Sequence, residues 1–129
     1  MQLFIKMYFA ALVPFALLDA TWISFIARGF YERQIGFVIN TFKVPPAIAF
    51  YIIYVLGIVY FAVRPTAGEP LLKTFLAGAL FGLCAYASYD LTNQATIAGW
   101  PTAVTLADMA WGAFASGTAA TVAGFLTRA

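Results

Sequence analysis

Four apolar stretches, each long enough to cross a lipid bilayer, dominate this sequence. A membrane-spanning helix needs about 20 mostly apolar residues, because the hydrocarbon core of a bilayer is about 30 Å thick. The stretches are residues 3–27, 45–63, 71–97 and 102–126. Only 9% of the 129 residues are charged and 64% are hydrophobic, well above the apolar share of a soluble domain. We therefore predict an all-α integral membrane protein, a four-transmembrane-helix bundle that forms a single membrane domain over residues 1–129.

Local breaks separate the predicted spans. Arg28-Gly29 ends the first, and Pro45-Pro46 opens the second because proline suits a first helical turn. The turn-rich connector 64–70 and the Gly99–Pro101 break divide the remaining stretches. We predict that the polar segment 30–43 lies along the membrane interface, with its Phe, Tyr and Ile side chains facing lipid. The first stretch is too long for a signal peptide, so we expect it to be retained as a span.

Each of the three aspartates, Asp19, Asp90 and Asp108, lies inside an apolar stretch with no Lys or Arg in the surrounding segment. A charged side chain at the bilayer centre costs roughly 2.5–3.5 kcal/mol on insertion scales, so such residues usually have a function. Their structural role would be hydrogen bonding between helices. Single intramembrane hydrogen bonds average only about 0.6 kcal/mol, which makes three carboxylates a poor means of holding helices together.

The three aspartates are predicted to lie at one depth. An even number of spans places both termini on one side, so connectors 28–44 and 99–101 share the other side. Asp19 lies nine residues before Arg28, Asp90 nine before Gly99, and Asp108 six after Thr102. At 1.5 Å per residue, all three fall roughly 9–14 Å below the same surface. The terminal side carries four basic residues and the opposite side three, a slight lean to cytoplasmic termini.

Helical spacing places small and aromatic residues beside these aspartates. One stripe of the third span and one of the fourth recur every three or four residues: Gly78, Gly82, Tyr86, Asp90 and Asn93, and Asp108, Gly112, Ser116, Ala120 and Gly124. Small residues at such spacing let helix backbones approach closely. Trp22 and Trp111 follow Asp19 and Asp108 by three residues, which places an indole beside each carboxylate. We predict an acidic, aromatic-lined pocket near one membrane face.

Several kinds of ligand suit such a pocket, and the residues alone do not decide among them. A cation with an apolar body would be held by charge and aromatic faces. A proton would be held because clustered carboxylates titrate at different pH values. A hard divalent ion would use carboxylate, amide and hydroxyl oxygens, with Asn93 and Thr96 joining the aspartates. A lipid or isoprenoid double bond could be protonated by a carboxylic acid.

Other classes of function are disfavoured by composition. The chain has no His and a single Cys, Cys84, which removes the usual ligands of haem and zinc sites and any internal disulfide. We predict no resident metal, and the sequence identifies no cofactor. The net charge of +2 is small and the basic residues are scattered, so we expect no nucleic-acid partner.

Three segments carry a resemblance to a known family: LLDATW (Leu17–Trp22), YDLTNQAT (Tyr89–Thr96) and DMAWG (Asp108–Gly112). Together they resemble the bacterial membrane-protein family known as domain of unknown function 2177, over essentially the whole chain. The resemblance implies a short, multi-pass, four-span protein of the bacterial inner (cytoplasmic) membrane. It carries no established activity. Members sometimes lie near fatty-acid-modifying enzymes, which inclines the interpretation toward lipids.

Our leading hypothesis is binding of a small amphipathic or lipidic ligand in this pocket, with acid–base chemistry on the ligand as a further option. Asp90 is the predicted catalytic acid or base, because two polar residues share its helix face. The predicted ligand-binding residues are Asp19, Trp22, Tyr86, Asn93, Asp108 and Trp111. One alternative is a small proton- or cation-coupled homo-oligomeric transporter, and another is an accessory subunit of a larger membrane complex. Membrane lipids are the expected partners.

Overall fold

The computed structural model describes residues 1–37 and 43–128, and of residue 26 the backbone alone. In chain order its elements are α1 (Gln2–Thr21), the π-helical turn η1 (Trp22–Ile26), α2 (Arg28–Ile35), α3 (Val44–Ile58), the π-helical turn η2 (Val59–Val63), α4 (Leu71–Thr96) and α5 (Thr102–Leu126). Within the described residues, four segments are long and apolar enough to cross a membrane: Gln2–Phe25, Val44–Val63, Leu71–Thr96 and Thr102–Leu126. The predicted all-α, four-span membrane bundle is confirmed.

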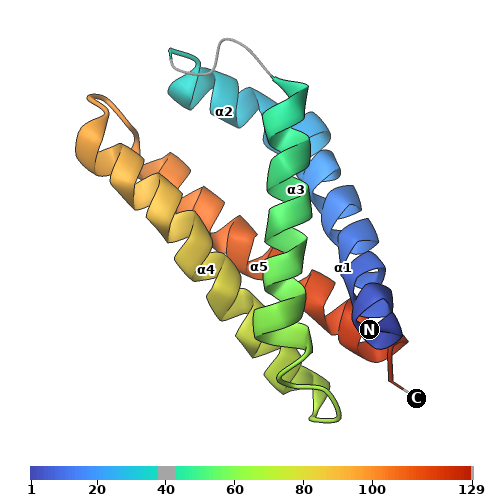
Figure 1. The fold of residues 1–129 in the computed structure, drawn as a ribbon. Coiled ribbons are helices and arrows are strands. Elements are labelled where there is room, and N and C mark those ends of the chain that lie inside the picture. Colours follow the sequence, from blue (N-terminus) through green and yellow to red (C-terminus); the bar gives the residue numbers. More distant parts are fainter. Residues whose placement is uncertain (38–42, 129) are drawn as a thin grey trace.

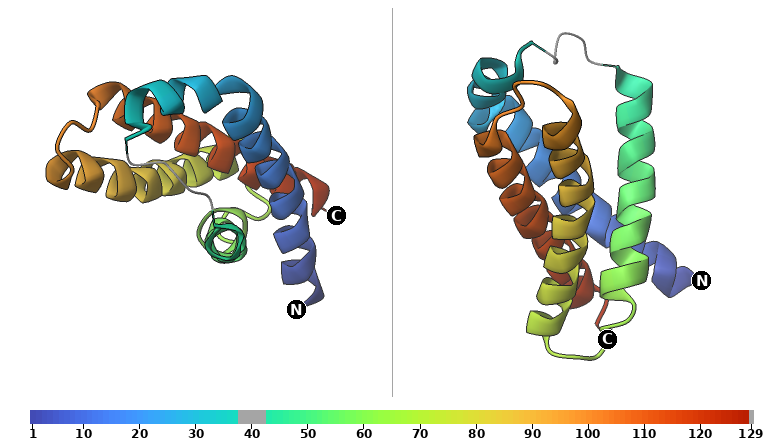
Figure 2. Two further views of the ribbon diagram at one scale, coloured as in Figure 1. Left: turned by 90° about the horizontal axis from the view of Figure 1, so that it is seen from above. Right: turned by 90° about the vertical axis from the view of Figure 1, so that its left-hand side faces the viewer.

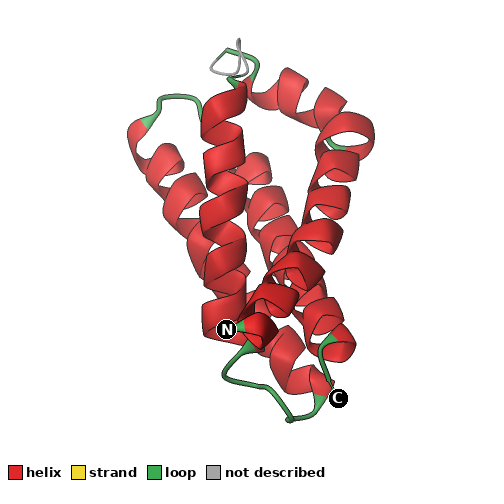
Figure 3. Ribbon diagram, turned by 45° about the vertical axis from the view of Figure 1, so that its right-hand side comes forward, coloured by secondary structure: helices red, strands yellow, loops and turns green. Residues whose placement is uncertain are grey.

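The helices form a bundle whose two ends differ. α4 and α5 lie side by side and make the most extensive helix–helix contact, with α1 packed mainly on α5 (Figure 1). α3 meets α4 chiefly through η2, near the 64–70 connector, and the two helices diverge toward the α2 end (Figure 2). Both described termini lie at the connector end, opposite α2 and the turn between α4 and α5 (Figure 3). We refer to the two ends as the terminal face and the α2 face.

Small residues explain why α4 and α5 lie so close. Gly78, Gly82, Gly112 and Ser116 are buried in this interface, as the two stripes predicted. A methyl group on Gly78 would come within 2.8 Å of both the Ala120 side chain and a backbone oxygen of α5. A methyl group on Gly82 would overlap the carbonyl oxygen of Gly112. The helices can therefore approach this closely only with glycine at these positions.

The core beneath these ridges is apolar, with one buried polar bond. Completely buried side chains fill the place where α1, α3 and α5 meet: Phe15, Val55, Ile58, Ala115, Ala119, Ala120 and Ala123. The Tyr54 hydroxyl shares a hydrogen bond of 2.6 Å with the Ser116 hydroxyl. A Tyr hydroxyl buried in a span needs such a partner, because neither lipid nor apolar side chains can supply one.

One side of α2 packs against the bundle. α2 lies over the end that carries the turn between α4 and α5, where Ile35 is buried against Trp100 and Val104. Tyr31 of the same helix is half-buried and faces α5. The prediction that the Tyr and Ile side chains of this segment face lipid is therefore wrong for these two residues, because the end of α5 offers them an apolar surface. Residues 38–42 of the segment lie outside the described residues.

Candidate functional site

The three aspartates lie on three different helices and gather in the part of the bundle covered by α2. Asp19 is on α1, Asp90 on α4 and Asp108 on α5. Asp90 is completely buried, Asp19 is 7% exposed, and Asp108 is half-buried. The three carboxyl groups differ in burial and in hydrogen-bond partners, so each is described separately. In the described part of the chain, no group of three His, Cys, Asp or Glu side chains is arranged to hold a metal ion.

Each carboxyl oxygen of Asp19 accepts a hydrogen bond from another helix. The Tyr51 hydroxyl on α3 donates to its Oδ2 at 2.6 Å. The indole N–H of Trp111 on α5 donates to its Oδ1 at 3.3 Å. Hydrogen bonds to a charged group are stronger than neutral ones. Asp19 therefore ties α1 to α3 and α5, which is the structural role considered for the aspartates.

Two stacked tryptophans separate Asp19 from Asp108. The rings of Trp22 and Trp111 lie parallel within 6°, with their centres 4.5 Å apart. The N–H of Trp22 donates to the Tyr31 hydroxyl at 3.0 Å, and that hydroxyl donates to Oδ1 of Asp108. A line of aromatic and polar contacts thus joins the two carboxylates. Trp22 also opens η1, and π-helical turns occur frequently at functional sites.

Tyr31 reaches this line from outside the spans. Its burial, followed by its hydrogen bond to Asp108, raises the pKa of the Tyr31 phenol above the ordinary value of 10.0. The hydroxyl therefore keeps its proton at neutral pH and can act as a donor to the carboxylate. Tyr31 was not predicted as a site residue, since its position in a polar connector indicated the membrane interface. Tyr51 was not predicted either, because no acidic neighbour in the sequence provides a signal.

Asp90 is bonded neither by a tyrosine hydroxyl nor by an indole N–H, unlike Asp19. Both of its carboxyl oxygens are buried, and no N–H or hydroxyl group of a described residue donates a hydrogen bond to them. The Asp108 carboxyl on α5 lies within hydrogen-bonding reach, so the two acids can pair through one shared proton. The described salt bridges, Arg28–Glu32 and Lys73–Glu69, involve none of the three aspartates. Burial of two neighbouring acids without a basic partner among the described residues is costly, so the pair needs an explanation other than packing.

Of the other residues considered for the site, Tyr86 packs on α5, whereas Asn93 and Thr96 make no hydrogen bond to Asp90. Tyr86 is half-buried against Gly112, and its ring meets that of Tyr54 edge-on at 6.1 Å. Asn93, one turn beyond Asp90, neighbours Tyr89 and donates no hydrogen bond to Asp90. Thr96 is exposed and donates to the Thr92 carbonyl at 2.8 Å. The oxygen set imagined for a divalent ion is therefore not assembled.

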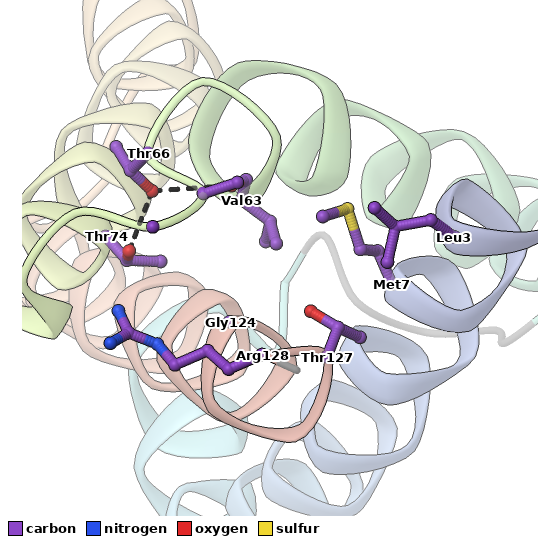
Figure 4. A pocket seen from close by; sticks show the side chains of 10 residues that line it. Leu3, Met7, Val63, Thr66, Thr74, Gly124, Thr127 and Arg128 are labelled. Carbon is purple, nitrogen blue, oxygen red and sulfur yellow. Dashed lines mark hydrogen bonds between the residues drawn. The ribbon is translucent and has the colours of Figure 1, made fainter.

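Two cavities lie at the terminal face, away from the aspartates. The smaller, of about 60 Å³, is enclosed by the start of α1, the end of α5 and the 64–70 connector (Figure 4). Its polar side includes Thr66 and Thr74, whose hydroxyls share a hydrogen bond of 2.7 Å. The larger is lined by Met1, Leu3, Phe4, Met7 and Arg64. Neither includes a predicted site residue, so the accessible part of the aspartate cluster is its half-buried rim, at Asp108, Trp22 and Trp111.

Comparison with known proteins agrees with the helical architecture. No curated protein and no solved structure matches the chain. Residues 4–126 match the family model described as "Predicted membrane protein (DUF2177)". That match includes all four spans and all three aspartates, and the chain belongs to this family of membrane proteins.

Proposed function

We propose that this protein, in the bacterial inner membrane, binds a small amphipathic or lipidic ligand at the aspartate–aromatic cluster. The observation that carries the proposal is Asp90, a completely buried carboxyl that receives no N–H or hydroxyl donor from the described residues and has another acid, Asp108, as its neighbour. A helix of this length could hold an apolar residue there at lower cost. A ligand group that binds this carboxyl would account for its presence.

The three aspartates then have separate roles. Asp19 supports the site, since Tyr51 and Trp111 already occupy both of its oxygens. Asp108 is the accessible carboxyl at the rim, held in place by the Tyr31 hydroxyl. Asp90 lies behind it, unused by the fold, and is the proposed acid or base for any chemistry on the ligand. A general acid or base acts within hydrogen-bond reach of the reacting group or through one water, so the ligand must come that close to Asp90.

The aromatic residues fit the apolar part of such a ligand. Trp22 and Trp111 are half-buried and present a stacked pair beside Asp108, and Phe114 packs against Trp111 with ring centres 5.8 Å apart. Tyr86 closes the site from α4, with its ring over the backbone of Gly112. Asn93 lies one turn farther toward the α2 face and would contact a ligand extending that way. Aromatic side chains with a polar end suit this depth, where a ligand passes from polar to apolar surroundings.

Native mass spectrometry tests the proposal. The protein would be purified in mild detergent as wild type, Asp90→Asn, Asp108→Asn and Ser88→Ala. Ser88 is the control, because it is exposed on α4 and its hydroxyl bonds only the Cys84 carbonyl of its own helix. We expect a bound small molecule or lipid on wild type and Ser88→Ala, and its loss from both aspartate variants. Retention by both aspartate variants would contradict the proposed site.

The same spectra address the two alternatives. A dimer without bound ligand, combined with Asp90-dependent ion flux in liposomes, would favour a homo-oligomeric transporter. A four-span chain is too small to enclose a path alone, so this function requires a second copy. A co-purifying subunit that is lost on substitution of the α4–α5 ridges would favour an accessory role in a larger complex.

A further inference from the structure

The larger cavity at the terminal face, away from the aspartates, combines an apolar wall with a basic side chain. Its volume is about 420 Å³. The residues that line it are Met1, Leu3, Phe4, Met7 and Arg64. Leu3 and Met7 also line the smaller cavity, where they lie opposite Thr66 and Thr74 (Figure 4). The two cavities therefore adjoin along α1, and we refer to them together as the terminal groove.

Two arginines supply the positive charge of the terminal groove. Arg64 directly follows η2 and lines the larger cavity, and Arg128 follows the end of α5 and lines the smaller one. The described salt bridges include neither arginine. The Arg64 guanidinium lies 5.8 Å from the centre of the Tyr60 ring, and that of Arg128 donates to the backbone carbonyl of Glu69. Neither charge is thus neutralised by a carboxylate among the described residues.

The lining residues favour an anion over a zwitterion. No Asp or Glu lines either cavity in the described part of the chain. The Thr66 and Thr127 hydroxyls donate to carbonyls of their own segments, Ala62 and Ala123, so they are already engaged. A guanidinium group only donates hydrogen bonds, and its planar fork of N–H groups matches the oxygens of a phosphate. The ammonium of a zwitterionic head group would meet positive charge here and no carboxylate.

The apolar wall favours a lipid over a free anion. Leu3, Phe4 and Met7 belong to the first membrane span, so they lie where an acyl chain can run along α1. We propose that the terminal groove binds an anionic phospholipid, with its phosphate at Arg64 and one acyl chain against these three side chains. Basic pockets beside membrane helices are suited to such head groups. This second site goes beyond the proposed function, since it shares no residue with the aspartate cluster.

A head-group comparison tests the charge. Detergent-purified protein would be titrated with phosphatidylglycerol and phosphatidylcholine of identical acyl chains, with binding followed by native mass spectrometry. We expect phosphatidylglycerol to bind at least about tenfold more tightly, since each of two basic residues contributes about 1 kcal/mol and 1.4 kcal/mol is tenfold. Arg64→Gln should lower this preference about fivefold. Lys6→Gln is the charge-matched control, because Lys6 lies on the same side of the membrane and lines neither cavity.

A filled groove tests the apolar wall without changing any charge. Leu3 lines both cavities and is 51% exposed, so a larger side chain can be accommodated and would occupy the space of the acyl chain. We expect Leu3→Trp to weaken phosphatidylglycerol binding at least about fivefold. Ile5→Trp is the matched control, because Ile5 is 48% exposed on the same helix and lines neither cavity.

The outcomes that would overturn the proposal are distinct. Equal binding of the two lipids by wild type would exclude an anionic head group. Equal losses in Arg64→Gln and Lys6→Gln would assign the attraction to the general surface charge. Binding of glycerol 3-phosphate as tightly as phosphatidylglycerol would show that the acyl chain is not recognised. Should Arg64→Gln fail to fold, the wild-type lipid ranking and the two Trp variants still decide.

The same variants separate this site from the aspartate cluster. Lipid in the terminal groove should be lost from Arg64→Gln and kept by Asp90→Asn and Asp108→Asn. The ligand of the aspartate cluster should show the reverse pattern. Either proposal can therefore fail while the other holds.

Discussion

Asp19 and Asp90 are chemically identical side chains in comparable apolar helices, yet the fold treats them oppositely. Asp19 receives a hydrogen bond on each oxygen, from Tyr51 and Trp111. Asp90 is more deeply buried and receives none from the described residues. Burial of a satisfied carboxylate can stabilise a fold, whereas burial of an unsatisfied one opposes folding. The two residues should therefore respond differently to the same substitution.

Asp19→Asn is expected to lower thermal stability more than Asp90→Asn. An amide offers a single acceptor oxygen, so one of the two donors to residue 19 loses its bond, at a cost of about 1 kcal/mol. At position 90 the amide N–H of the new asparagine can replace the carboxyl of Asp90 as hydrogen-bond donor to Asp108. Thermal unfolding in one detergent compares the two. A larger loss for Asp90→Asn would show that its carboxyl supports the fold.

Tyr31→Phe is expected to weaken the alkaline sensitivity of the fold. Burial and the neighbouring Asp108 raise the pKa of Tyr31 in the folded protein above its ordinary 10.0. The stabilisation linked to its proton is complete below the ordinary value and is lost as pH rises from there through the folded pKa. Thermal midpoints measured across this alkaline range should fall less steeply for Tyr31→Phe than for wild type. Parallel curves would mean that the phenol is not held protonated by folding.

At the scale of elements, α4 and α5 form the scaffold that brings Asp90 next to Asp108. Their backbones meet where glycines face each other, and Gly112 also receives the ring of Tyr86. The spacing of small residues predicted this contact, because a helical stripe is set by local geometry. It could not predict the fold of α2, whose Tyr31 and Ile35 find partners on α5 that are distant in sequence.

Two glycine substitutions separate packing from helix propensity. Gly82→Ala places a methyl group against the Gly112 carbonyl, and we expect a loss of about 1–3 kcal/mol from overpacking. Gly124→Ala meets Thr74 Cγ2 at 3.4 Å, an ordinary contact, and should be neutral or stabilising by up to about 1 kcal/mol. Unfolding in detergent measures both. Equal effects would indicate that close backbone approach does not limit this helix pair.

At the scale of the whole molecule, the three aspartates lie toward the α2 face, and the terminal side carries four basic residues against three on the α2 side: Lys6, Arg64, Lys73 and Arg128 against Arg28, Arg33 and Lys43. This asymmetry gives the slight preference for cytoplasmic termini under the positive-inside rule. The cluster would then lie in the outer half of the bilayer. A ligand would reach it from that leaflet or from the periplasm.

Cysteine labelling measures this orientation. In a Cys84→Ser background, Glu32→Cys reports on the α2 face and Glu69→Cys on the terminal face. Both glutamates are exposed, so each cysteine is accessible to a reagent on its own side. We expect a membrane-impermeant maleimide to label position 32 in intact spheroplasts and position 69 only after lysis. The reverse pattern would place the site toward the cytoplasm.

What the amino-acid sequence determined by itself is the part governed by local physics. Span length and helical period predicted the four helices, the α4–α5 ridges and the similar depth of the three aspartates. Only the tertiary structure decided which carboxyl receives hydrogen bonds from neighbouring helices and which is paired with a second acid. Tyr51 and Tyr31 lie 32 and 77 residues from the aspartates that they bind, and no sequence period links such distant positions. The difference between Asp19 and Asp90 arises from those partners, which meet only when the bundle is assembled.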